Sequence, residues 1–254
     1  MLEAQGLTKF YSSIPALEDV SFVAEPGHVL GYLGHNGSGK STTVNILTGL
    51  LEPSRGRVLF EGRPIQDQLI DYKRRLGYVP EEPYVYPYLS GYEYLELVGR
   101  LRQVPEPILK DKIEGLLKLF SLQTYRHSPI ASYSKGMKQK VLISAALLHN
   151  PDVLIFDEPL SGLDVTSALT FRHLLTALAG EGKTVLYSSH VLETVEKVCS
   201  RVIILYRGKM VANDRVDRLR DLMSLPSLES VFAQLVVQED TVKTAQQIVD
   251  VMKG

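Results

Sequence analysis

The sequence that decides the fold of this chain is GHNGSGKS, residues 34–41. It fits the phosphate-binding pattern G-x-x-x-x-G-K-[ST] at every fixed position. The apolar residues 29–33 before it have the length of a buried strand, and residues 44–51 after it place apolar side chains at helical spacing. The glycines therefore lie where a strand must turn sharply into a helix. This context separates a phosphate loop from a chance match or an ordinary glycine-rich turn.

The residue types of this phosphate loop (residues 34–41) suit a nucleoside triphosphate. Its glycines carry no Cβ, so the backbone can curl with successive N–H groups pointing inward. The helix that starts near Lys40 adds about half a positive charge at its N-terminus. We expect Lys40 to contact the β- and γ-phosphates and Ser41 to ligate Mg²⁺. The predicted nucleotide-binding residues are Gly34, His35, Asn36, Gly37, Ser38, Gly39, Lys40, Ser41 and Thr42.

Composition bounds the class of protein. The 254 residues are 44% hydrophobic, which suffices for one large domain or for one domain with an embedded subdomain. A net charge of −1 gives no basic field for nucleic acid or a membrane surface. The single cysteine, Cys199, excludes an internal disulfide and fits a reducing compartment. No apolar run approaches the ~20 residues of a membrane helix, and the N-terminus lacks a signal-peptide pattern. We therefore expect another chain to supply any membrane spans.

Apolar segments alternate with helical patterns along most of the chain. Residues 153–156, 184–187 and 201–206 are apolar enough for strands covered on both faces, which predicts a parallel sheet. Residues 2–30 indicate an antiparallel β edge, whereas residues 92–149 are mostly helical and interrupt the alternation. The expected fold is α/β, with a mostly parallel phosphate-loop core, an N-terminal antiparallel edge and an inserted helical subdomain. We place this domain at residues 1–215, its insertion at about 84–150, and an extension with two amphipathic helices at 216–254.

Two carboxylates follow one of these predicted strands. Ligands of such sheets bind beyond the carboxyl ends of the strands, so the phosphate loop, Asp157-Glu158 and His190 should meet in one crevice. Asp157 can hold Mg²⁺ through its water shell, and Glu158 can accept the proton of an attacking water. Adjacent acids often form only a solvated corner. The buried strand and the phosphate loop upstream favour the catalytic interpretation.

A second anion site is predicted at YSKGMKQK, the signature segment (residues 133–140). A serine hydroxyl, a glycine backbone and the start of an apolar helix can together hold a phosphate. With this segment, residues 2–215 resemble the ATP-binding cassette (ABC) family, the motor subunits of ABC transporters. The signature of that family is usually Leu-Ser-Gly-Gly-Gln. This chain keeps Ser134 and Gly136, and has Tyr133, Lys135 and Met137 at the other positions.

The resemblance implies a role for each matching residue. Two cassettes of the family pack head to tail, so Ser134, Lys135, Gly136 and Met137 would serve ATP held by the partner. Asp164 ends the loop that couples the two sites, the coupling loop (residues 161–164). His190 looks like the switch histidine that contacts the γ-phosphate. Tyr11 looks like the aromatic residue that stacks on adenine, although by itself an exposed tyrosine in a polar loop is more often a local surface contact.

The resemblance also implies cofactors and partners. These are ATP and Mg²⁺, a second copy or a paralogous cassette, and an integral membrane permease, with no nucleic acid. The chain would then work at the cytoplasmic face of the cell membrane. Its signature segment is similar to that of cassettes from exporters whose permease is a separate polypeptide. The tyrosines of residues 84–94 form either a docking surface for the permease or part of the core of the insertion.

Two other classes of protein compete with a transporter motor. A soluble ABC ATPase could act on ribosomes, DNA or cluster assembly. However, the chain has a single cassette, no long coiled coil, no cysteine cluster and no basic arm. A kinase or GTPase with a phosphate loop is disfavoured by the signature segment and by the absence of a guanine-reading Asn-Lys-x-Asp sequence.

The family usually has glutamine where this chain has Glu81, which is expected to be a metal ligand and to influence the attacking water. A glutamine also offers an oxygen ligand, whereas a carboxylate can only accept hydrogen bonds. We therefore predict that Glu81→Gln keeps at least about a tenth of the ATPase rate, as measured by phosphate release. A loss as deep as that of Glu158→Gln would instead identify Glu81 as a second base.

Overall fold

The computed structural model describes residues 1–189, 191–223, 225, 227–236 and 241–253. Its larger sheet has the strand order β10-β9-β3-β8-β7-β6. These strands are β3 (Val29–Gly34), β6 (Leu76–Val79), β7 (Val153–Asp157), β8 (Thr184–Ser188), β9 (Arg201–Tyr206) and β10 (Lys209–Arg215). All neighbours are parallel except β9 and β10, which form an antiparallel hairpin, as the turn residues Arg207-Gly208 after the third apolar segment predict. Every residue of β3, β7 and β8 is buried, as their apolar sequences predict.

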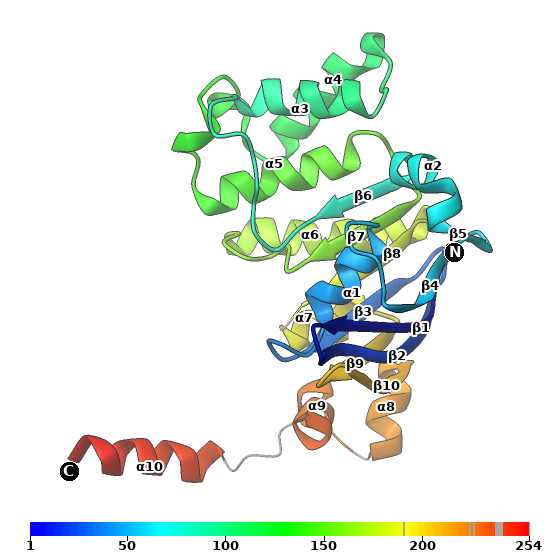
Figure 1. Ribbon diagram of the computed structural model, residues 1–254. Helices are drawn as coiled ribbons and strands as arrows, with labels where there is room; N and C mark the ends of the chain where they lie inside the picture. The colour runs from blue at the N-terminus through cyan, green and yellow to red at the C-terminus, as the bar shows by residue number, and fades with distance from the viewer. Residues whose placement is uncertain (190, 224, 226, 237–240, 254) are drawn as a thin grey trace.

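The predicted antiparallel edge is a separate sheet of order β2-β1-β4-β5. Its strands are β1 (Leu2–Tyr11), β2 (Ile14–Ala24), β4 (Arg55–Phe60) and β5 (Arg63–Pro64). Helix α1 (Lys40–Leu47) lies in the core between the two sheets (Figure 1). Val44 and Leu47 of α1 pack there with side chains of both sheets, such as Leu17 and Ile155. The helix that follows the phosphate loop is therefore fixed on two sides.

Helices cover the opposite face of the larger sheet. They are α6 (Val165–Gly180), α7 (Leu192–Val198), α8 (Val216–Met223) and α9 (Leu228–Val236). Phe156 of β7 meets Phe171 of α6 edge to face, with ring centroids 5.0 Å apart. Apolar residues 228, 231, 232 and 235 follow helical spacing, which predicts one buried face for α9. This is confirmed for Leu228 and Val231, which are fully buried.

The end of the chain holds one helix more than the sequence predicted. Helix α8 precedes the two expected ones, α9 and α10 (Thr241–Lys253). Val216 and Leu219 of α8 are buried against the larger sheet. In α10, Val251 and Met252 are about 80% exposed (81% and 80%). No helix in the described part of the chain combines the length and the apolar character needed to cross a membrane.

The insertion consists of α3 (Gly91–Leu101), α4 (Glu106–Leu119) and α5 (Lys135–Leu147), with short 3-10 turns between them at Gln123–Tyr125 and Ile130–Ser132. Leu95, Ile113 and Val141 belong to a hydrophobic core of its own. The three-residue spacing of Leu95, Val98 and Leu101 predicts one shared helix face. This is wrong for Leu101, which is 73% exposed, whereas Leu95 is fully buried. At 3.6 residues per turn these two positions differ by about 120° around the helix. The segment Ile65–Gln68 and helix α2 (Leu69–Arg74) had no sequence prediction.

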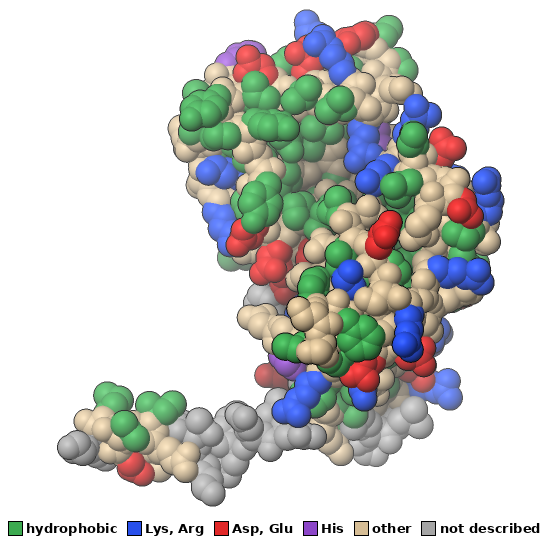
Figure 2. Space-filling model, in the orientation of Figure 1, with side chains coloured by type: hydrophobic (Ala, Val, Ile, Leu, Met, Phe, Trp, Pro, Cys, Tyr) green, Lys and Arg blue, Asp and Glu red, His purple; other side chains and the backbone are tan. Residues whose placement is uncertain are grey.

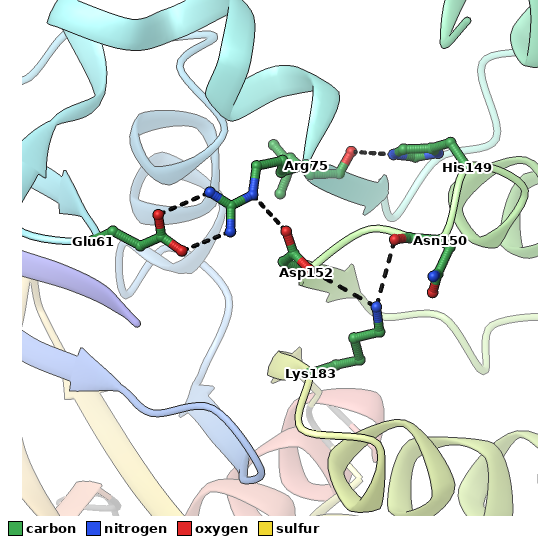
Figure 3. A network of polar contacts seen from close by, with 7 residues as sticks. Glu61, Arg75, His149, Asn150, Asp152 and Lys183 are labelled. Carbon is green, nitrogen blue, oxygen red and sulfur yellow. Dashed lines mark hydrogen bonds and ion pairs between the residues drawn. The ribbon is translucent and has the colours of Figure 1, made fainter. Parts of the chain in front are cut away.

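A network of charges joins the two sheets at the edge opposite the phosphate loop (Figure 3). The Arg75 guanidinium donates two hydrogen bonds to Glu61, of 2.8 and 2.6 Å, and a third to Asp152. It also lies 4.6 Å from the centroid of the Phe60 ring. The neighbouring His149 is neutral, because burial lowers its pKa to about 4, and its Nε2 lies 3.1 Å from the carbonyl oxygen of Leu76. Arg75 thus connects the end of β4 with the start of β7.

We predict that Arg75→Met lowers the free energy of unfolding by about 1 kcal/mol at pH 7, the value for partly exposed ion pairs after screening. The pKa of Glu61 lies below its usual 4.5, chiefly because of the hydrogen bonds from Arg75. The stabilisation by this ion pair is therefore fully present above about pH 4.5, the usual pKa of the carboxyl group, and is lost as the pH falls through the lowered pKa of Glu61 in the folded state. Urea unfolding at several pH values measures it. The control Arg74→Met removes only an exposed pair with Asp71, and equal losses for both variants would contradict the prediction.

Candidate active site

The phosphate loop borders a cavity of about 730 Å³ at the carboxyl ends of the parallel strands. The described residues that line it are Ala16, His35, Asn36, Gly37, Gly39, Lys40, Ser41, Thr42, Glu81 and Glu158. Most predicted nucleotide-binding residues therefore face one space, together with two of the predicted acids. The sequence did not predict Ala16 as a lining residue, because it belongs to no motif and lies beside the loop through the pairing of distant segments.

The glycines of the loop allow close backbone contacts. A Cβ on Gly39 would lie 2.6 Å from the carbonyl oxygen of Ala16, and one on Gly34 would lie 2.8 Å from that of Leu205. Gly39 also has φ +107°, a conformation that L side chains rarely adopt. Gly37 has φ +78° but open space around it. Gly34 and Gly39 therefore allow the loop to pack closely against the backbone of neighbouring segments, whereas Gly37 allows the loop to curve.

Lys40 and the first turn of α1 hold the loop from inside. Lys40 is 7% exposed, and its ammonium donates to the carbonyl oxygens of Gly34 and His35, at 2.7 and 3.3 Å. The Tyr32 hydroxyl donates to Thr43 at 2.9 Å, and Thr43 donates to the carbonyl oxygen of Gly39 at 3.0 Å. Because Gly39 occupies the N-cap position of α1, no side chain covers the first N–H groups of the helix there. A helix start of this kind favours an anion.

Two adjacent acids end β7 beside this cavity. Asp157 is 4% exposed, and its pKa is raised to about 6, first by burial and then by the charges of Glu81 and Glu158, while Ser188 and Lys40 oppose the rise. Glu158 lines the cavity with φ +46°, in the left-handed region. Its N–H donates to Ser188 at 3.0 Å, and its carbonyl accepts from the N–H of Ser161 at 3.2 Å. The Ser189 hydroxyl lies 3.5 Å from the Glu158 carboxylate.

The two remaining predicted nucleotide contacts are His190 and Tyr11. His190 lies outside the described residues. Tyr11 ends β1 and is 50% exposed, but it is not among the residues that line the cavity. The ammonium of Lys9 lies 5.8 Å from the centroid of its ring. The role of Tyr11 as a stacking partner for adenine therefore stays a prediction.

The signature segment lies elsewhere on the chain. Ser134 occupies the N-cap of α5 and accepts the N–H of Met137 at 3.2 Å. Among the described residues that line the cavity, none comes from the signature segment. Ser134 and Lys135 are exposed instead. The fold thus separates the two predicted anion sites of one chain.

The signature segment contacts the coupling loop of its own chain. A Cβ on Gly136 would lie 2.3 Å from the carbonyl oxygen of Gly162. Lys135 donates to the Ser161 hydroxyl at 2.7 Å, and Lys140 pairs with Asp164 at 3.2 Å. The Asp164 carboxylate also caps α6 by accepting from Ser167, and these bonds hold its pKa well below the usual range. Gly136 is therefore required inside its own chain. Sequence reasoning identified Ser161 only as part of a motif and did not predict these contacts.

Known proteins resemble this chain over most of its length. The sequence model of the ABC transporter family matches residues 17–161. The ABC transporter ATP-binding protein NatA of Bacillus subtilis is 36% identical over 89% of this chain and 92% of its own length. The ABC-type transporter ATP-binding protein EcsA of the same organism is 32% identical over 94% of this chain and 98% of its own length.

Solved structures agree with these relatives. The ATP-binding subunit of an ABC transporter superposes with a TM-score of 0.87 at 34% identity, covering 92% of this chain and 99% of that one. A dimeric ATP-binding cassette in a post-hydrolysis state, bound to ADP and Pi, gives 0.79 at 27% identity, covering 85% and 98%. With the phosphate loop, the paired acids and the sheet order in place, the chain belongs to the ABC transporter family, as an ATP-binding and ATP-hydrolysing subunit.

Proposed function

We propose that this subunit works as a dimer in which each ATP lies between the phosphate loop of one chain and the signature segment of the other. The observation that carries this proposal is the separation of the two anion sites within one chain. Ser134 and Gly136 are held at the start of α5, away from the cavity that the phosphate loop lines. A second copy or a paralogous cassette in head-to-tail orientation would bring its own signature segment to the open side of this cavity. The dimeric relative bound to ADP and Pi supports this arrangement.

Hydrolysis needs a base beside the γ-phosphate. Glu158 lines the cavity, and its backbone is fixed on both sides by Ser188 and Ser161. In the proposed mechanism its carboxylate accepts the proton of the attacking water. Lys40 turns its ammonium from the loop carbonyls to the β- and γ-phosphates, and the N–H groups at the start of α1 hold their oxygens. His190 is proposed to contact the γ-phosphate.

The residues around Asp157 suit Mg²⁺. A divalent cation would offset the burial that raises the pKa of this carboxyl group, and Ser41 and Glu81 line the adjacent cavity. In the described residues, no cluster of three or more His, Cys, Asp or Glu side chains could hold a metal ion alone. This fits Mg²⁺, which takes one or two carboxylates and completes its shell with water and substrate phosphates. When bound, it neutralises charge on the phosphates.

A surface of the insertion offers a place for a membrane permease. Tyr84, Tyr86 and Tyr88 follow Glu81 and are 77%, 62% and 91% exposed. Apolar side chains also gather over the upper part of the molecule, where the insertion lies (Figure 2). Tyr92 and Tyr94 are half-buried and pack against the core of the insertion, so the tyrosines divide between docking and packing. Docking to an integral membrane permease would place the subunit at the cytoplasmic face of the cell membrane.

The glycine contacts predict unequal effects on ATP binding. Gly37→Ala meets only the cost of a positive φ, about 1 kcal/mol. Gly39→Ala meets the same cost and places a Cβ 2.6 Å from a backbone oxygen. We expect Gly37→Ala to weaken binding of a fluorescent ATP analogue less than tenfold, and Gly39→Ala to weaken it at least about a hundredfold. Thermal unfolding of both variants serves as the control for folding, and equal affinities would contradict this account of the loop.

The composite site is tested by Glu158→Gln. Removal of the base should lower ATP hydrolysis by about 10²–10⁴-fold and leave ATP binding intact, so that a dimer accumulates with ATP and Mg²⁺ on size-exclusion chromatography. Adding Ser134→Arg to this variant should return it to monomers, because the new side chain would meet the nucleotide of the partner. Near-normal turnover of Glu158→Gln would refute the base, and an unchanged dimer in the double variant would refute the composite site.

A further inference from the structure

Lys135 replaces a residue that is usually glycine in the family signature, and its side chain reaches the coupling loop. Its ammonium donates to the Ser161 hydroxyl at 2.7 Å. Its methylene groups cover the next residue, because a Cβ on Gly162 would lie 3.1–3.3 Å from three carbons of Lys135. The neighbouring backbones of Gly136 and Gly162 touch as well. The start of α5 therefore holds the coupling loop by an ammonium, an alkyl chain and a backbone contact.

Ser161 also contacts the proposed base. Its N–H donates to the carbonyl oxygen of Glu158 at 3.2 Å. Glu158 has φ +46°, a conformation that costs about 1–2 kcal/mol for a residue with a Cβ. Such a conformation persists only where the surroundings fix it. Ser161 is thus one of the groups that keep the Glu158 backbone in this conformation, and Lys135 fixes Ser161.

We propose that Lys135 is a positioning residue that acts through Ser161 on the carboxylate of Glu158 in the same chain. This inference rests on the proposed role of Glu158 as the base. Lys135 stands between Ser134 and Gly136, which are proposed to bind the partner's ATP. Closure on that ATP is therefore linked to the base of the chain's own site by two hydrogen bonds, Lys135 to Ser161 and Ser161 to Glu158.

The hydrogen bond from Lys135 to Ser161 positions the coupling loop locally and contributes little to the stability of the chain. Lys135 is exposed, and an exposed polar contact of this kind adds little to the free energy of unfolding. A small displacement of a catalytic group can nevertheless slow a reaction greatly, because the reacting atoms must be aligned. The loss of Lys135 should therefore appear in the rate of hydrolysis and not in the thermal midpoint.

A different role for Lys135 would be direct contact of its ammonium with the phosphates of the partner's ATP. The two roles differ in what they require of Ser161. A phosphate contact does not need the Ser161 hydroxyl, whereas positioning of Glu158 does. They also differ kinetically, since a phosphate contact contributes to ATP binding and positioning contributes to the chemical step.

The test is a double-mutant cycle in the full-length chain with Lys135→Met, Ser161→Ala and the double variant, assayed by ATP hydrolysis over a range of MgATP concentrations. We expect each single variant to lower kcat about tenfold with KM within about twofold. The double variant should be no slower than the slower single variant, because both changes break the same connection. Lys135→Arg, which can still donate to Ser161, should restore most of the rate.

Lys118→Met provides the matched control, since it removes the same charge from an exposed position on α4, outside the signature segment and the coupling loop. Its kcat should stay within about twofold of the native value. The proposal is overturned if Lys135→Met raises KM, if its effect and that of Ser161→Ala multiply, or if Lys118→Met is equally slow. Normal turnover of Glu158→Gln would instead refute the assignment of Glu158 as the base. Failure of the proposed function can therefore be distinguished from failure of the role proposed for Lys135.

Discussion

The structure depends on the seating of one backbone turn between β3 and α1. Gly34 and Gly39 bring the loop within van der Waals distance of Leu205 and Ala16, at positions where a Cβ would collide. Lys40 closes the turn from inside through the carbonyls of Gly34 and His35. The turn can hold this shape because β3 is paired on both sides and α1 is packed between two sheets. Its N–H groups are therefore in place before any anion arrives, and binding needs little ordering of the chain.

The parallel sheet brings the rest of the chemistry to this turn. Asp157 is the last residue of β7, and Glu158 follows it. Ser188 is the last residue of β8, the strand beside β3, and Ser189 follows it. Parallel strands end at the same edge, so side chains more than a hundred residues apart meet without a special contact between them. The opposite edge carries the Arg75 network, which joins the antiparallel sheet to the start of β7. Binding and stability are thus assigned to opposite edges of one sheet.

Helix α5 links the insertion with the catalytic core. Its N-terminus carries Ser134, and its body contributes both to the core of the insertion and to the face of the larger sheet. Helix α5 therefore connects the core of the insertion, the larger sheet and, through the hydrogen bond from Lys135 to Ser161, the coupling loop. In the proposed mechanism, this connection would pass a displacement of the docking surface on to the reaction centre.

The sequence by itself determined the phosphate loop, the parallel sheet, the hairpin after β9 and the family, because each depends on local pattern: glycine spacing, apolar runs and motif order. The roles of the site residues remain predictions. Only the tertiary structure decided that Gly136 must be glycine because of Gly162, that Lys135 reaches Ser161, and that Arg75 joins Glu61 to Asp152. These pairs are far apart in the chain, and periodicity reports which face of an element is buried but not which distant residue lies against it.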